Sequence, residues 1–315
     1  MIERPPVGAS VDLGSNSVHL LVASIVGHEL RPLVDESAFL GLGKAVDERA
    51  HLGSRARAEL VETLEGYATT ARRLGATSIT FMGTEPVRRA ADGARIGDAI
   101  ERASGVPLHV LSHEEEAYLT LIGVTAGLPV RHETLVVDIG GGSSEFCAVA
   151  PGGVARAAGL RLGSNRLTHR FVRNDPPTPT QIEHMRTAAD DILGMALPAE
   201  PAEVVVVGGT ASNLLKVTVA GVADRIITGT RIAEALAALS AGTAAEVTLR
   251  YGVNPKRTPL LPAGVVIVDA LMRRYHVDQV RVSDEGMREG AILVANHAGR
   301  SWRDRLPELA HGWRR

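Results

Sequence analysis

Short apolar runs alternate along the chain with longer stretches in which apolar positions recur at helical spacing, a pattern typical of α/β proteins. The apolar runs predict strands at Val7–Leu13, Val18–Val26, Ser78–Met82, Leu108–Leu111, Thr134–Ile139, Glu145–Ala150, Val204–Val207 and Gln279–Ser283. The helical stretches predict helices at Ser54–Leu74, Ile96–Ala103, His113–Ala126, Ser164–Val172, Thr178–Leu197, Ser212–Ala220, Arg231–Ala241 and Thr258–Tyr275. We therefore expect an α/β fold.

The chain carries an internal duplication. The sequence Val-Asp-Leu-Gly-Ser-Asn-Ser at 11–17 recurs as Val-Asp-Ile-Gly-Gly-Gly-Ser at 137–143, 126 residues later. In each copy an aspartate, Asp12 or Asp138, ends a predicted strand, small residues fill a turn, and a second strand follows. Such self-similarity indicates two related structural units. We expect two duplicated α/β lobes, residues 1–128 and 129–315, and leave open that the final helix packs back on the first lobe.

The two duplicated turns are candidates for binding phosphate. Glycine lets backbone N–H groups approach an anion without a Cβ in the way, and serine hydroxyls add donors. The candidate ligands are Gly14, Ser15, Asn16 and Ser17 in the first turn and Gly140, Gly141, Gly142, Ser143 and Ser144 in the second. Ordinary tight hairpins would explain one such turn, but two copies favour a phosphate clamp.

A third glycine-rich turn, Gly208-Gly209-Thr210, follows the predicted strand Val204–Val207 and precedes a helix. Backbone N–H groups at a helix N-terminus favour anions. Either a simple helix start or a further phosphate contact explains this turn.

Composition narrows the function classes. Among the 315 residues, 34 Lys+Arg stand against 36 Asp+Glu, so the net charge of −2 argues against general nucleic-acid or membrane binding. Aromatic residues make up 3%, too few for stacking platforms that bind single strands. The single cysteine, Cys147, excludes an intramolecular disulfide and is interpreted as core packing. Without an apolar N-terminal run, we expect a cytoplasmic protein.

Several blocks, in this order, resemble the exopolyphosphatase/guanosine pentaphosphate phosphohydrolase family. They are residues 12–17, Gly83-Thr-Glu-Pro-Val-Arg88, Glu114-Glu-Glu-Ala117, residues 138–145, Leu162-Gly-Ser164, residues 208–210 and Gly286-Met-Arg-Glu-Gly290. The resemblance implies two actin-like (ribonuclease H-like) lobes with an inter-lobe cleft. It also implies a phosphoanhydride hydrolase that uses Mg²⁺ (or Mn²⁺), with Arg88 as a phosphate ligand.

Carboxylates supply the candidate chemistry. Ser112 and Glu115 have the spacing of a capping box, which gives Glu115 a structural role. The resemblance places a catalytic glutamate directly before Ala117, so we expect Glu116 to be the base that activates water. Asp138 and Glu145, with Asp12 in the duplicated motif, are the predicted metal ligands, because carboxylates suit a hard cation. Asp138 and Glu145 are also candidate catalytic residues, and Glu145 would serve either the metal site or the positioning of water. Glu145 would otherwise be a solvent-facing strand residue.

The arginines outside these blocks have simpler interpretations. Five of them, Arg156, Arg161, Arg166, Arg170 and Arg173, form a basic stretch that either guides a polyanion or is a solvated face. The last group is expected in a terminal helix and a frayed tail: Arg300, Arg303, Arg305, Arg314 and Arg315.

The predicted function is release of terminal orthophosphate from inorganic polyphosphate by metal-assisted water attack. Three alternatives stay open: hydrolysis of guanosine pentaphosphate or short polyphosphate, an ATP-dependent sugar or metabolite kinase on the same fold, and a non-catalytic alarmone sensor. We expect no nucleic-acid or membrane partner, and a homodimer is possible.

Overall fold

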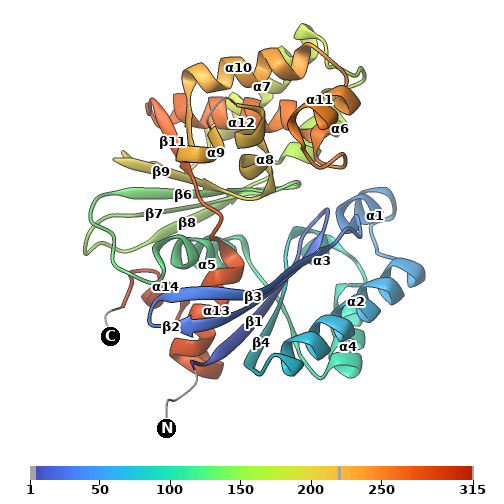
Figure 1. Ribbon diagram of the computed structural model, residues 1–315, viewed down its shortest axis with the longest axis vertical. Helices are drawn as coiled ribbons and strands as arrows, with labels where there is room; N and C mark the ends of the chain where they lie inside the picture. The colour runs from blue at the N-terminus through green and yellow to red at the C-terminus, as the bar shows by residue number, and fades with distance from the viewer. Residues whose placement is uncertain (1–4, 219–220, 314–315) are drawn as a thin grey trace. The chain divides into compact units, whose positions relative to one another are not determined.

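The computed structural model describes residues 5–218 and 221–313 and divides the chain into two compact units (Figure 1). The first comprises Met1–Pro129 and Glu285–Arg315, and the second Val130–Asp284. The expected second domain ran to residue 315, whereas the structure assigns everything after Asp284 to the first unit. The predicted inter-lobe cleft stays a prediction.

The described part of the first unit contains a five-stranded sheet of order β3-β2-β1-β4-β5. Its strands are β1 (Val7–Leu13), β2 (Val18–Val26), β3 (Glu29–Ala38), β4 (Ala76–Gly83) and β5 (Leu108–Val110). Strands β1, β4 and β5 run parallel, while β2 and β3 add antiparallel neighbours at the β1 side. The carboxyl ends of the three parallel strands therefore lie along one edge of this sheet.

Helices cover both faces of the first sheet (Figure 1). The helices are α1 (Leu42–Arg49), α2 (Ser54–Arg73), α3 (Glu85–Arg89), α4 (Gly93–Ser104), α5 (His113–Thr125), α13 (Met287–Ala298) and α14 (Leu306–Leu309). The apolar faces of α2 and α4 form one core with β1, and α5 and α13 form another on the opposite face. A Cβ on Gly290 would lie 1.9 Å from the Leu119 carbonyl oxygen, so only glycine permits this close approach of α13 to α5.

The described part of the second unit contains a six-stranded sheet of order β10-β11-β9-β6-β7-β8. Its strands are β6 (Thr134–Ile139), β7 (Ser144–Val149), β8 (Arg156–Leu160), β9 (Glu203–Val207), β10 (Ile226–Thr228) and β11 (Gln279–Val282). Its helices are α6 (Ser164–Phe171), α7 (Pro179–Leu193), α8 (Gly209–Val217), α9 (Gly221–Asp224), α10 (Gly229–Ser240), α11 (Ala244–Tyr251) and α12 (Leu261–Arg274). The central helix α12 is buried along most of its length against α7.

The predicted α/β class is confirmed, and the two units have the predicted actin-like architecture. Each predicted strand and helix corresponds to an element of the structure; three strands match at both ends, Val7–Leu13, Val18–Val26 and Thr134–Ile139, and the other elements have shifted ends. The predicted helix Ser212–Ala220 begins earlier, at Gly209, and its residues 219–220 lie outside the described residues. In residues 5–218 and 221–313, no helix has the length and apolar content that crossing a membrane requires.

The C-terminal segment corrects one expectation. Trp302–Trp313 is not a frayed tail, because Trp302, Leu306 and Leu309 are buried in the core shared with α5 and α13. Arg303 is hydrogen-bonded within this unit. Arg314 and Arg315 lie outside the described residues.

Candidate functional site

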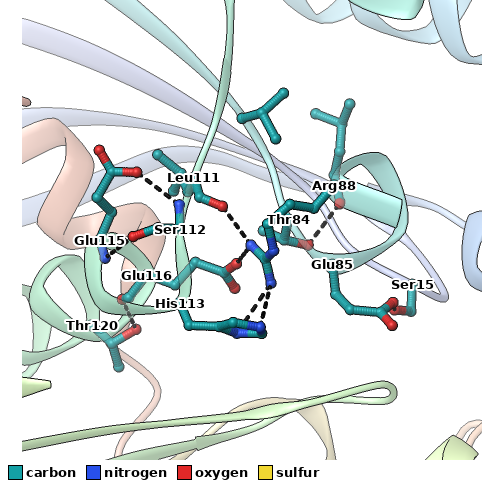
Figure 2. A network of polar contacts seen from close by, with 12 residues as sticks. Ser15, Thr84, Glu85, Arg88, Leu111, Ser112, His113, Glu115, Glu116 and Thr120 are labelled. Atoms are coloured by element: carbon teal, nitrogen blue, oxygen red, sulfur yellow. Dashed lines mark hydrogen bonds and ion pairs between the residues drawn. The ribbon is translucent and has the colours of Figure 1, made fainter. Parts of the chain in front are cut away.

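The side chains of Arg88 and Glu116 meet where β5 ends and α5 begins (Figure 2). One guanidinium nitrogen, Nη1, donates to Glu116 Oε1 and, over 2.5 Å, to the carbonyl oxygen of Leu111. The other, Nη2, lies 3.1 Å from Nδ1 of His113. Because Glu116 is 7% exposed, this charge-assisted contact forms away from bulk water and fixes the carboxylate in one orientation.

The local sequence explains why α5 begins at His113. The Ser112 hydroxyl accepts from the Glu115 backbone N–H over 3.2 Å, and the Glu115 carboxylate accepts from the Ser112 N–H over 2.7 Å. These two hydrogen bonds confirm the predicted capping box. The cap leaves Glu116 on the first turn, one helical turn from His113 and on the same face.

The first glycine-serine turn is held by neighbouring loops of its own unit. The Gly14 N–H donates to the Ser17 carbonyl over 3.1 Å, which closes the turn. The Gly43 N–H donates to the Ser15 carbonyl over 2.8 Å. The Ser15 hydroxyl lies 3.3 Å from Oε2 of Glu85, to which it donates. The predicted phosphate ligands of this turn are therefore fixed in place, and their contact with phosphate stays a prediction.

The second hairpin places two carboxylates opposite each other. Asp138 on β6 pairs directly with Glu145 on β7 in the antiparallel register. Directly opposed residues project to the same face with Cβ atoms about 5 Å apart. Glu145 is 4% exposed, so the alternative of a solvent-facing residue is wrong: β7 lies inside the sheet and is buried along its whole length.

The second turn packs against the start of α6. The Ser164 N–H donates to the Gly140 carbonyl over 3.1 Å, and Arg166 Nε donates to the Gly142 carbonyl over 2.9 Å. The fully buried Ser144 donates its hydroxyl to the Leu162 carbonyl over 2.6 Å. Arg166, assigned to the basic stretch, therefore supports the turn, and the hydroxyl proton of Ser144 is used within the protein.

The third turn lies beside Asp138. Gly208 has φ +98°, and a Cβ there would be 2.7 Å from Asp138 Oδ1, so the backbone leading into α8 passes directly over this carboxylate. The Thr210 hydroxyl lies 3.1 Å from that of Ser164, which joins the third turn to the second. The blocks at 138–145, 162–164 and 208–210 thus form one structural cluster within the second unit.

The positively charged side chain of Arg257 lies at the start of α8. Its guanidinium carbon lies 3.2 Å from the position of a Cβ on Gly209, the first residue of the helix. The guanidinium and the positive end of the helix therefore adjoin each other next to the Asp138 carboxylate. This arrangement suits a bound anion, in which phosphate oxygens contact guanidinium and backbone N–H donors together.

The donor chemistry of the second hairpin fits a divalent cation. Two carboxyl groups directly opposite each other on a sheet place oxygen ligands side by side, and oxygen ligands are what a hard divalent cation takes. Asp138 and Glu145 would hold Mg²⁺ or Mn²⁺ at this position. Asp12 occupies the corresponding place in the first hairpin, where its directly opposed partner is His19, and its role as a ligand stays a prediction.

Three residues of these clusters escaped the sequence analysis. His113 directly follows the helix cap, and its position three residues before Glu116 was a usable signal. Glu85 lies inside the Thr84-to-Arg88 block and is 7% exposed, accepting from Arg89 over 2.7 Å. Arg257 carried no local signal, because tertiary folding alone brings it to Gly209. Cys147 is fully buried as expected, and desolvation by burial raises the pKa of its thiol to about 12.

Known proteins are similar to this chain in sequence and in fold. Residues 21–297 match the model of the Ppx/GppA phosphatase family. "Exopolyphosphatase 1" of Mycobacterium tuberculosis (strain H37Rv) is 29% identical over 307 residues, covering 90% of this chain and 86% of that protein. The crystal structure of the Aquifex aeolicus Ppx/GppA family member matches with a TM-score of 0.82 at 24% identity, covering 94% of this chain and 99% of that one. An exopolyphosphatase structure from Cytophaga hutchinsonii gives the same TM-score at 21% identity, covering 93% and 98%. The chain belongs to the Ppx/GppA phosphatase family.

Proposed function

We propose that the chain is an exopolyphosphatase that releases terminal orthophosphate from inorganic polyphosphate, with Glu116 activating the attacking water. The observation that carries this proposal is the buried carboxylate of Glu116, held by Arg88 at the start of α5. A general base must keep its oxygen in a fixed position toward the water. The resemblance to proteins named exopolyphosphatases supports polyphosphate as the substrate.

The reaction requires few covalent roles from the protein. A water oxygen attacks the terminal phosphorus in line, the bridging P–O bond breaks, and the shortened chain leaves with the bridging oxygen. Glu116 accepts the proton of the water. Catalysis is otherwise positioning and charge stabilisation, because the phosphorus centre and its oxygens carry the developing charge.

The second unit supplies the anion contacts in this proposal. Backbone N–H groups of residues 141–143 and 208–210, with the Arg257 guanidinium, are the donors for phosphate oxygens, whereas the Gly140 N–H closes the turn by donating to the Ser143 carbonyl. A divalent cation held by Asp138 and Glu145 supplies charge neutralisation of the phosphate oxygens when bound. Residues 15–17 of the first unit offer a second set of backbone donors, since the Gly14 N–H already donates to the Ser17 carbonyl.

Glu116→Gln tests the proposed base, with Glu114→Gln as its matched control. Both glutamates lie in the first turn of α5, but Glu114 is exposed. Glu116→Gln should lower the rate of orthophosphate release about 10²- to 10⁴-fold while polyphosphate binding persists, and Glu114→Gln should release phosphate at the wild-type rate. Turnover by Glu116→Gln at the wild-type rate refutes the assignment.

Phosphate release from long polyphosphate, short polyphosphate and guanosine pentaphosphate tests the substrate. The proposal predicts the highest kcat/KM for inorganic polyphosphate. A higher kcat/KM for guanosine pentaphosphate would assign the chain to that substrate with the same chemistry. ADP formation that depends on an added sugar would instead indicate a kinase, and tight binding without turnover in Mg²⁺ would indicate a sensor.

A further inference from the structure

The junction between β5 and α5 is held by two arginines that make parallel sets of contacts. Arg88 binds the Leu111 carbonyl and the Glu116 carboxylate. Arg303, from the C-terminal segment, binds the Val110 carbonyl over 2.7 Å and the Glu115 carboxylate. Each arginine thus takes one of two consecutive carbonyls and one of two consecutive glutamates.

The contact between Arg303 and Glu115 uses both carboxylate oxygens. Nε donates to Oε1 over 2.5 Å, and Nη2 donates to Oε2 over 2.9 Å. Oε2 also accepts from the Ser112 N–H, which is the capping bond of α5. Arg303 therefore fixes the group that caps the helix, and a bidentate pair resists rotation better than a single contact.

The surrounding packing holds Arg303 in place. The Trp302 ring contacts the His109 ring edge-on, with centroids 5.4 Å apart and an interplanar angle of 76°. At the other end of α5, the Trp313 N–H donates to the Gly127 carbonyl over 2.8 Å. The C-terminal segment Trp302–Trp313 thus contacts the chain before and after α5, about 190 residues away in sequence.

We propose that Arg303 is a positioning residue for the Glu116 carboxylate, acting through Glu115 and the start of α5. The inference rests on the proposed function, because Glu116 must act in the reaction for its position to matter. Consecutive residues of a helix share one backbone and are fixed about 100° apart around its axis, so the two residues move together. A shift of the Glu115 cap therefore moves Glu116 relative to Arg88.

The physical consequence is a loss in kcat with little change in KM. Arg303 contacts no residue assigned to phosphate binding in the described chain, so substrate affinity should persist. A base displaced by a fraction of an ångström loses rate steeply, and about a tenfold fall is expected. The pKa of the Glu115 carboxyl is lowered despite burial, because Arg303 and the Ser112 N–H stabilise its charged form.

The test compares Arg303→Met with Arg305→Met. Arg305 belongs to the same segment but forms an exposed pair with Glu308 over 2.8 Å. Steady-state phosphate release from polyphosphate, measured well below each variant's Tm and per folded protein, should show kcat about tenfold lower for Arg303→Met and KM within twofold. Arg305→Met should match the wild type in both constants.

Two further variants separate positioning from folding. Arg303→Lys keeps the charge but loses the bidentate contact, so its kcat should fall between those of wild type and Arg303→Met. Combining Glu115→Gln with Arg303→Met should lower kcat no further than Arg303→Met alone, because both act through one contact. If Arg303→Met does not fold, a wild-type kcat for Arg303→Lys overturns the inference.

The remaining outcomes distinguish this inference from the proposed function. A wild-type kcat for Arg303→Met overturns the inference, as does a rise in KM that accounts for the whole loss of kcat/KM. An active Glu116→Gln variant refutes the proposed function instead. An inactive Glu116→Gln variant beside an unaffected Arg303→Met variant refutes the positioning role alone.

Discussion

The two duplicated hairpins use one backbone pattern for different chemistry. In each, an aspartate is the next-to-last residue of the first strand and faces the seventh residue after it across the ladder: Asp12 faces His19, and Asp138 faces Glu145. Only the second pair consists of two acidic groups. The second hairpin therefore offers two oxygen ligands to a cation, whereas the first pairs one carboxylate with an imidazole.

The turns that follow the next parallel strand, β4 in the first unit and β9 in the second, also differ. Both β4 and β9 run parallel to the strand that carries the aspartate. After β9, Gly208 brings the backbone over Asp138, and α8 begins with Arg257 beside it. After β4, the Thr84 hydroxyl donates instead to the Leu13 carbonyl over 2.9 Å, and the short helix α3 carries Arg88 toward Glu116. The two units keep the same pairing of strands. The first unit holds the proposed base, and the second holds the proposed metal and anion contacts.

The largest expected effect comes from removing the acidic character of the second pair. Glu145→Gln should weaken Mg²⁺ binding on the order of 100-fold, since the amide offers a poorer ligand for a hard cation. Phosphate release should fall with it at fixed Mg²⁺. His19→Gln changes the corresponding residue of the first hairpin and should leave the Mg²⁺ dependence of phosphate release at its wild-type midpoint.

Thermal unfolding with and without Mg²⁺ sharpens the same comparison. Added Mg²⁺ should raise the Tm of the wild type and of His19→Gln but not that of Glu145→Gln. Equal Mg²⁺ stabilisation of all three proteins would place the cation away from the second hairpin.

The next effect concerns the backbone over Asp138. Gly208 has φ +98° and ψ 165°, a conformation open to little besides glycine, and an added Cβ would press on Asp138 Oδ1. Gly208→Ala should therefore lower the free energy of unfolding by about 2 to 3 kcal/mol and reduce phosphate release. Urea denaturation measures the first quantity, and kcat the second.

Gly252→Ala is the matched control for Gly208→Ala. Gly252 also has positive φ, at +62°, but nothing lies within 4 Å of an added Cβ. Gly252→Ala should lower the free energy of unfolding by about 1 kcal/mol and keep the wild-type kcat. Equal stability losses at the two positions would show that contact with Asp138 adds nothing to backbone strain.

The sequence predicted the hairpins well because their apolar residues are buried in central strands. Val7–Leu13, Val18–Val26 and Thr134–Ile139 match the structure at both ends. Strand β3 was missed because it is an edge strand with polar, mostly exposed residues, held by its ladder to β2 rather than by burial. Helix α13 was missed because Gly290 weakens the helical pattern. The reason for a glycine at this position is close packing of α13 on α5, a tertiary contact that the local sequence does not reveal.

Only those parts of the site that are formed within a short stretch of sequence could be predicted. The capping box that places Glu116 and the Asp138–Glu145 hairpin each lie within a short stretch of sequence. The contacts of Arg257 with Gly209 and of Arg303 with Glu115 join segments far apart in the chain. Both arginines stand in polar, irregular stretches that resemble solvated loops, so periodicity carries no information about them.

The smallest expected effect is a difference between the two units in how much stability each loses as the pH falls. In the first unit, burial and the Arg303 charge lower the pKa of His109, although Glu115 opposes this, so the folded state disfavours the imidazolium form. Its contribution to stability is full above its ordinary pKa of 6.5 and is lost as the pH falls through the folded value. In the second unit, Arg281 and His132 lower the pKa of Glu203 against desolvation, so its contribution is lost only as the pH falls below its ordinary value of 4.5. Native-state hydrogen exchange at pH 7 and pH 5 should therefore show protection decreasing in β5 and α5 more than in β6 and β9. His109→Gln should abolish that difference, and a loss that stays equal in the two units would remove His109 as its cause.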